Sequence, residues 1–144
     1  MEIQIHQLNP EIKVTEEQLL KVCEVVCAEL ALSDGSCDFI FVDDTTLSKM
    51  HDTFLNDPEP TDVITFNLSD DEIEGEVYIS YERAIEHAGI YSVSPEEEIV
   101  RLMIHGLLHL KGYDDRSEDD QSEMKRVENH LIGIAKTQVL PGIL

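Results

Sequence analysis

Basic side chains are scarce in this sequence. Its 144 residues include ten lysines and arginines against 31 aspartates and glutamates, a formal net charge of −21. Proteins that bind nucleic acids through phosphate contacts normally present clustered basic residues, so this balance argues against tight, non-specific RNA or DNA binding. The distribution weakens the objection. Residues 1–100 hold four basic and 24 acidic side chains, whereas residues 101–144 hold six and seven and are nearly neutral.

Cysteines and long hydrophobic runs are also few. The odd count of three, Cys23, Cys27 and Cys37, and the lack of an export signal in Met1–Ile5 predict reduced thiols rather than a disulfide framework. Cys23 and Cys27 could supply half a metal site, but buried core cysteines are the favoured interpretation. No window is apolar for long enough to span a membrane. We therefore expect a cytoplasmic protein without membrane association.

Patterns of apolar residues predict one α+β domain spanning residues 1–144. Alternating or short apolar runs indicate strands at 2–8, 37–42, 62–68 and 76–80. Helical spacing and capping residues indicate helices at 15–30, 43–55, 82–88, 95–110 and 117–138. A breaker cluster at 56–60 should end the second helix, and Gly89 the third. We expect a mixed sheet of about four strands covered by helices.

The helix expected at 95–110 carries two histidines on its only polar stripe. Apolar side chains cover most of its circumference, which is typical of a helix buried at the centre of a domain. The remaining stripe holds Glu98, Arg101, His105 and His109. Packing alone does not explain two imidazoles in that position.

His105 and His109 are four residues apart, so their rings should lie close enough to share a metal ion. Gly112 can end the helix in a left-handed conformation, and that turn could bring Asp115 to the same side. Two imidazoles and one carboxylate leave a fourth position for water, the pattern of catalytic rather than structural zinc. The alternative is two hydrogen-bonded core histidines beside a loop aspartate.

The spacing H-x-x-x-H-x-x-G-x-x-D resembles the zinc site of metzincin peptidases, with Gly106 in place of their glutamate base. A closer resemblance is to the bacterial YbeY family, whose pattern runs H-G-x-L-H-L-x-G-Y-D-H. Residues 105–115 fit ten of these eleven positions and differ at the last, where Asp115 replaces a histidine. Residues 60–66 and 75–80 resemble two further family segments, P-T-D-V-L-S-F and G-D-I-x-I-S, in the same order.

This resemblance implies a zinc-dependent endoribonuclease that cleaves single-stranded RNA in rRNA maturation and ribosome quality control. It implies one Zn²⁺ per chain, or another divalent ion, held by His105, His109 and Asp115. Its partners would be an rRNA precursor and the ribosome or ribosomal proteins. Two alternatives remain: a metal-stabilised ribosome assembly factor that cuts nothing, and a metallopeptidase, which Gly106 disfavours.

Two departures from the family pattern bear on activity. An aspartate ligand leaves one less positive charge on the ion than a third histidine, so bound water should be less acidic. The family also carries a tyrosine–arginine pair before P-T-D-V, and its arginine is implicated in RNA processing. These two places fall on Phe54 and Leu55. The arginine is therefore missing, unless Arg101 or Arg116 replaces it in space.

The sequence does not identify a single general base. Because Gly106 removes the metzincin base, either metal-activated water attacks unaided or a carboxylate elsewhere assists. Asp62 and Glu76 are the candidates, on strands that the resemblance places near the cleft. Asp114 could compete with Asp115 as a ligand, but it lies one residue short of the motif spacing. We prefer a role for Asp114 in supporting the ligands.

Overall fold

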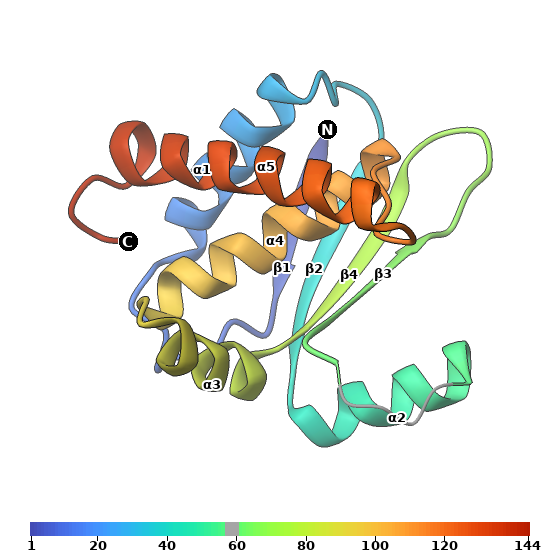
Figure 1. Ribbon diagram of the computed structural model, residues 1–144, viewed down its shortest axis with the longest axis horizontal. Coiled ribbons are helices and arrows are strands. Elements are labelled where there is room, and N and C mark those ends of the chain that lie inside the picture. Colours follow the sequence, from blue (N-terminus) through green and yellow to red (C-terminus); the bar gives the residue numbers. More distant parts are fainter. Residues whose placement is uncertain (57–60) are drawn as a thin grey trace.

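The computed structural model describes residues 1–56 and 61–144 (Figure 1). Of the expected breaker cluster at 56–60, only residue 56 lies within these ranges. Pro60, the first residue of the P-T-D-V-like segment, lies outside them. The strands are β1 (Glu2–His6), β2 (Ser36–Val42), β3 (Val63–Asn67) and β4 (Glu74–Ser80). The helices are α1 (Glu16–Glu29), α2 (Asp44–Leu55), α3 (Tyr81–Tyr91), α4 (Pro95–Lys111) and α5 (Glu118–Ile134), followed by the π-helical turn η1 (Ala135–Val139).

The four strands form one mixed sheet in the order β1-β2-β4-β3. β1 runs parallel to β2, and β2 runs parallel to β4. The edge strand β3 is antiparallel to β4, with Thr65 opposite Val77 and Phe66 opposite Glu76. The predicted α+β class and four-stranded mixed sheet are therefore confirmed.

Helix α4 is the central helix of the fold. It begins at Pro95 after Ser94, whose hydroxyl accepts a hydrogen bond from the Glu97 amide at 3.0 Å. It ends at Gly112, which has a φ of 117°, a left-handed conformation that glycine tolerates best. Between these caps it contacts β3, β4, α1, α3 and α5, and crosses the sheet in Figure 1. Most of its side chains are buried, as its apolar circumference predicted.

Gly106 is a point of close approach between α4 and the sheet. A Cβ atom added at this position would lie 2.8 Å from Cγ1 and 2.9 Å from Cγ2 of Val77 on β4. Such separations are shorter than van der Waals contact, so only glycine fits without a shift of helix or strand. The glycine directly after the first histidine is thus dictated by packing.

Two of the expected helix ends are wrong. Helix α3 continues through Gly89 to Tyr91 and ends where Ser92 adopts a left-handed φ of 57°. Gly89 lies on an exposed face, where it lowers helix propensity without breaking the turn, while Ala84 and Ala88 anchor the helix. The last helix is regular only to Ile134 and then widens into η1.

The three cysteines are free and buried, as predicted. Burial raises the pKa of the Cys23 thiol and raises that of Cys37 to about 12. In the described part of the chain, no helix has the length and apolarity needed to cross a membrane.

Candidate metal centre

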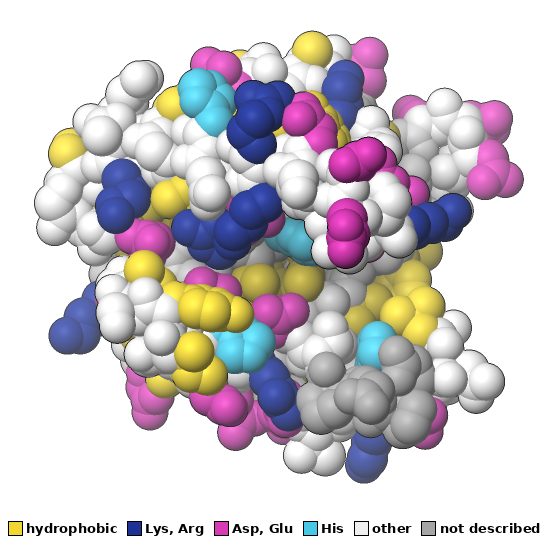
Figure 2. Space-filling view, in the orientation of Figure 1, with side chains coloured by type: hydrophobic (Ala, Val, Ile, Leu, Met, Phe, Trp, Pro, Cys, Tyr) yellow, Lys and Arg dark blue, Asp and Glu magenta, His cyan; other side chains and the backbone are white. Residues whose placement is uncertain are grey.

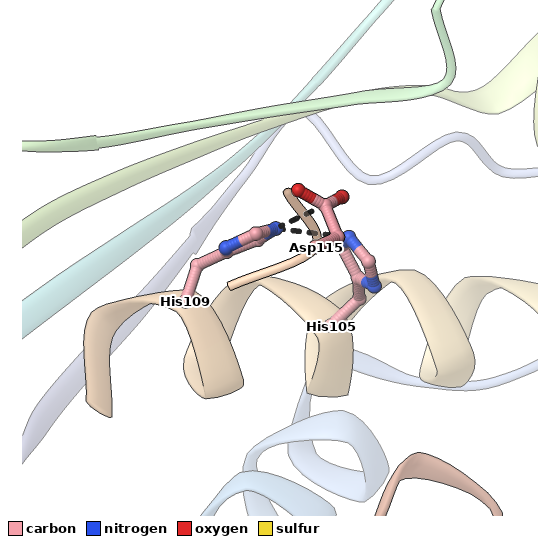
Figure 3. Close-up of side chains that lie close together, drawn as sticks. All are labelled: His105, His109 and Asp115. Carbon is pink, nitrogen blue, oxygen red and sulfur yellow. Dashed lines mark hydrogen bonds and ion pairs between the residues drawn. The ribbon is translucent and has the colours of Figure 1, made fainter. Parts of the chain in front are cut away.

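His105 and His109 face each other on one side of α4 (Figure 3). Their Nε2 atoms are 3.1 Å apart, and the ring centroids are separated by 4.7 Å at an interplanar angle of 81°. This arrangement follows from the four-residue spacing on a regular helix. The Nε2 atoms of both rings therefore point toward the same place.

The turn after α4 adds Asp115 to this pair. The amides of Gly112 and Tyr113 donate to the Leu108 carbonyl at 3.1 and 3.0 Å, which folds the chain back over the helix end. Asp115 Oδ2 then lies 3.9 Å from His109 Nε2. One ligand atom from each of His105, His109 and Asp115 lies within 4.8 Å of the others. The structure thus brings together the three predicted ligands.

The second ring nitrogen of each histidine has its own partner. His105 Nδ1 lies 3.0 Å from Glu128 Oε2, and His109 Nδ1 lies 3.1 Å from the Tyr113 carbonyl. Because both partners are acceptors, each Nδ1 carries the proton and each Nε2 presents a lone pair. Two lone pairs 3.1 Å apart repel, and a shared cation removes that repulsion. Burial, followed by the nearby His105, lowers the pKa of His109 and favours the neutral imidazole that metals require.

A zinc ion fits this donor set. Zinc binds imidazole nitrogen and carboxylate oxygen at about 2.0–2.2 Å, which needs only a small inward movement of Asp115. The side chain of Asp115 is 55 % exposed and free to make it. Manganese and other divalent ions accept the same ligand types.

Glu128 on α5 is a residue of this centre that sequence analysis missed. Its side chain is buried, and its second oxygen, Oε1, accepts from Arg101 at 3.0 Å. Burial acts to raise the pKa of Glu128, but hydrogen bonds from His105 and Arg101 outweigh it and the pKa is lowered. A signal was available: Glu128 falls on the same helix face as Met124 and Leu131, where a carboxylate needs a buried partner.

The candidate replacements for the missing arginine are placed differently: Arg101 lines the pocket that contains His105, whereas Arg116 lines neither pocket described below. Arg101 donates to Glu128 and, at 2.9 Å, to Asn129 Oδ1. Arg116 is 89 % exposed and pairs with Asp114 at 3.4 Å. Asp114 also accepts the Arg116 amide at 2.7 Å, so it stabilises the turn that presents Asp115.

The centre lies in a hollow of the surface. A pocket of about 540 Å³ between α4 and α5 and another of about 600 Å³ beside β3 share Asp62, His105 and Asp115. Figure 2 shows a hollow on this face, below α5, with histidine and acidic side chains along it. Leu55, at the family's arginine position, lines the pocket beside β3. A side chain at position 55 can therefore reach the centre.

The two candidate general bases are placed differently. Asp62 lines both pockets, and its Oδ2 lies 3.2 Å from His87 Nδ1. Glu76 neighbours Val77, which faces α4, so the side chain of Glu76 points to the opposite face of the sheet. There it accepts a hydrogen bond from the Tyr78 hydroxyl at 3.0 Å. The structure brings Asp62, and not Glu76, to the centre.

Comparisons with known proteins agree on one family. The family model described as Endoribonuclease YbeY matches residues 2–135. The Endoribonuclease YbeY of Flavobacterium psychrophilum is 39 % identical over 128 residues, covering 88 % of this chain and 91 % of that protein. The one from Aquifex aeolicus is 29 % identical over 125 residues, covering 83 % of each. The solution structure of TM1509 from Thermotoga maritima superposes with a TM-score of 0.71 at 26 % identity, covering 94 % of this chain and 90 % of that one. This chain belongs to the YbeY family.

Proposed function

We propose that this protein is a metal-dependent endoribonuclease that cleaves single-stranded RNA during rRNA maturation, with a part in ribosome quality control. The observation that carries the proposal is the convergence of His105, His109 and Asp115 in a surface hollow, with both histidine Nδ1 atoms held by acceptors. The names of the relatives, Endoribonuclease YbeY, supply the reaction class.

His105, His109 and Asp115 would hold one divalent ion, and zinc suits their donor atoms. When bound, such an ion supplies Lewis-acid polarisation of a phosphoryl oxygen and acidifies a water molecule. Glu128 keeps the Nδ1 proton on His105 and fixes the orientation of its ring. The Tyr113 carbonyl does the same for His109.

Asp62 is the carboxylate best placed to take a proton from the attacking water. It lines both pockets that contain His105 and Asp115, and its side chain is 26 % exposed and reaches solvent. Its Oδ2 lies 3.2 Å from His87 Nδ1, which helps to fix the orientation of the carboxylate. No role in the reaction is proposed for Glu76.

A ribosome assembly factor that binds its target without cutting it is the second candidate function. Leu55 favours it, because this apolar residue lines the pocket where the family carries arginine. A metallopeptidase is disfavoured by Gly106, where packing against Val77 leaves no room for a glutamate side chain.

Substrate placement is expected to depend on a partner. The net charge of −21 opposes encounter with RNA, and ribosomal proteins or the ribosome would offset that repulsion. The proposed setting is the cytoplasm, where these partners are found.

Metal content and RNA cleavage, measured on the same preparations, test this proposal. Wild type, His109→Ala, Asp115→Ala and the exposed control His130→Ala are purified without chelator and analysed for elements. We expect about one zinc per chain in wild type and control, lost in the other two variants. Cleavage of a fluorescent single-stranded RNA should follow the metal.

Metal bound without cleavage, even with ribosomal particles present, would favour the assembly factor. Wild-type protein without metal would contradict the hydrolase. Cleavage that survives in His109→Ala would show that the activity lies elsewhere.

A further inference from the structure

A second group of metal-binding side chains lies beside the first. Asp62 precedes β3, His87 is on α3 and Glu98 is on the first turns of α4, and one ligand atom from each lies within 4.8 Å of the others. His87 Nδ1 and Asp62 Oδ2 are 3.2 Å apart. Three elements distant in sequence thus place two carboxylates and an imidazole around one point.

Glu98 is the unusual member of this group. Only 2 % of the residue is exposed, and its Oε2 is the buried side-chain oxygen that lacks a hydrogen-bond partner among residues 1–56 and 61–144. The nearest cation is Arg101, whose Nε is 4.0 Å away and whose other nitrogen donates to Glu128 and Asn129. Buried carboxylate oxygens are normally hydrogen-bonded or bound to a metal, because leaving one unpaired is costly.

The neighbouring Glu97 shows how the same turn satisfies a buried carboxylate. Its Oε1 pairs with Lys136 Nζ at 2.8 Å, on the other side of α4. At Glu98 the ion pair found among residues 1–56 and 61–144 is the long one to Arg101 Nε, at 4.0 Å. Burial raises the pKa of the Glu98 carboxyl, and the distant charge of Arg101 does not offset this.

We propose that Asp62, His87 and Glu98 form a second divalent-cation site, on the wall of the pocket that also contains His105 and Asp115. Asp62 and Glu98 line that pocket together with His105. The two carboxylates neutralise a divalent charge. Their oxygen atoms, with one imidazole nitrogen, suit a hard ion such as Mn²⁺ better than a soft ion.

The side chains differ in their freedom to close on an ion. Glu98 is fixed within the helix packing, whereas the side chains of Asp62 and His87 are 26 % and 24 % exposed. An ion bonded at about 2.1 Å draws its ligands closer than they stand, so Asp62 and His87 would move toward Glu98.

This second cation would hold a phosphate oxygen of RNA in a pocket that Arg101 also lines. Binding of an RNA phosphate by this cation rests on the proposed nuclease function, whereas binding of the cation itself does not. The two can therefore be tested separately.

Manganese binding to full-length protein tests the site. Protein carrying one zinc is titrated with MnCl₂, and free Mn²⁺ is followed by its EPR signal while elemental analysis checks that zinc stays bound. The variants are His87→Ala and Glu98→Gln. Glu97→Gln is the matched control, because it alters the adjacent buried glutamate of the same turn.

We expect wild type and Glu97→Gln to bind one further Mn²⁺, and His87→Ala and Glu98→Gln to bind it at least tenfold more weakly. Mn²⁺ should raise the melting temperature of wild type but not of Glu98→Gln. If Glu98→Gln does not fold, Asp62→Asn takes its place.

Absence of a second Mn²⁺ in wild type, or equal binding by His87→Ala, would overturn the proposal and leave Glu98 as a protonated buried acid. Loss of zinc or of RNA cleavage in His109→Ala reports on the first centre alone, so failure of either proposal is distinguishable.

Discussion

Glu128 on α5 accepts a hydrogen bond from Nδ1 of His105 on α4, with an Oε2–Nδ1 distance of 3.0 Å. The bond joins two helices whose sequences are separated by the Asp115 turn. The orientation of one metal-binding imidazole is therefore set by packing between helices as well as by α4 itself. A carboxylate in this position also makes the imidazole a better electron donor.

Replacing Glu128 with glutamine should weaken zinc binding by about 10–100-fold, because the charge that orients and polarises His105 is lost. Competition with a chromogenic chelator measures the affinity. Glu123→Gln is the control, since Glu123 lies on the exposed side of the same helix and pairs with Arg126. Equal affinities for the two variants would contradict the role given to Glu128.

Asp115→His should keep the metal and raise cleavage at neutral pH. A neutral third ligand leaves the ion with one more positive charge, so bound water loses its proton more readily and the rate profile moves to lower pH. The pH dependence of cleavage measures this shift. Asp114→His should leave the profile unmoved, and metal lost from Asp114→Ala but kept in Asp115→Ala would contradict this ligand assignment.

Leu55→Arg should raise RNA cleavage by ~10-fold or more, because a guanidinium beside the centre can stabilise charge on the transferring phosphate. Leu55 is 52 % exposed and lines the pocket, so the longer side chain has room. Leu68→Arg is the control for added charge alone, since Leu68 is exposed and does not line either pocket described above. Equal rates in the two variants would show that position 55 has no special access.

Gly106→Ala should destabilise the fold by about 1–3 kcal/mol, the usual cost of overpacking a core. The added methyl group would press on Val77, and Val77→Ala in the same chain should recover part of the loss. Urea unfolding measures both. Gly133→Ala on α5 is the comparison, because its Cβ meets no atom within 4 Å and helix propensity then favours alanine. Similar changes at 106 and 133 would contradict the packing argument.

Thiol labelling tests whether Cys23 and Cys37 are buried in the core. Because burial raises the pKa values of Cys23 and Cys37, the latter to about 12, both thiols stay protonated at pH 8. Ellman's reagent should modify them slowly in the folded protein, and all three cysteines quickly in urea. Fast labelling of Cys37 in the folded state would contradict its placement in the core.

Local patterns predicted most of the fold and the central motif. Ser94, Pro95 and Gly112 bracket α4 by capping rules that act within one turn, and the four-residue histidine spacing has a geometric meaning only on a helix. Glu128 and Glu98 were not predicted as site residues, because their importance depends on which helices pack together. Glu76 was expected near the centre because its sequence pattern indicates a strand. The pattern did not indicate which face of the sheet its side chain points toward, and that face is the one opposite α4.

The contact between Gly106 and Val77 also limits how this site can change through mutation. In a metzincin peptidase the residue after the first histidine carries the general base, so sequence comparison alone suggests that one codon change at position 106 converts one hydrolase into the other. Here that change would force α4 away from β4 and carry both histidines with it. A smaller residue at position 77 would have to appear first. Conversion of the nuclease into the peptidase therefore needs at least two substitutions in a fixed sequence, first at position 77 and then at position 106.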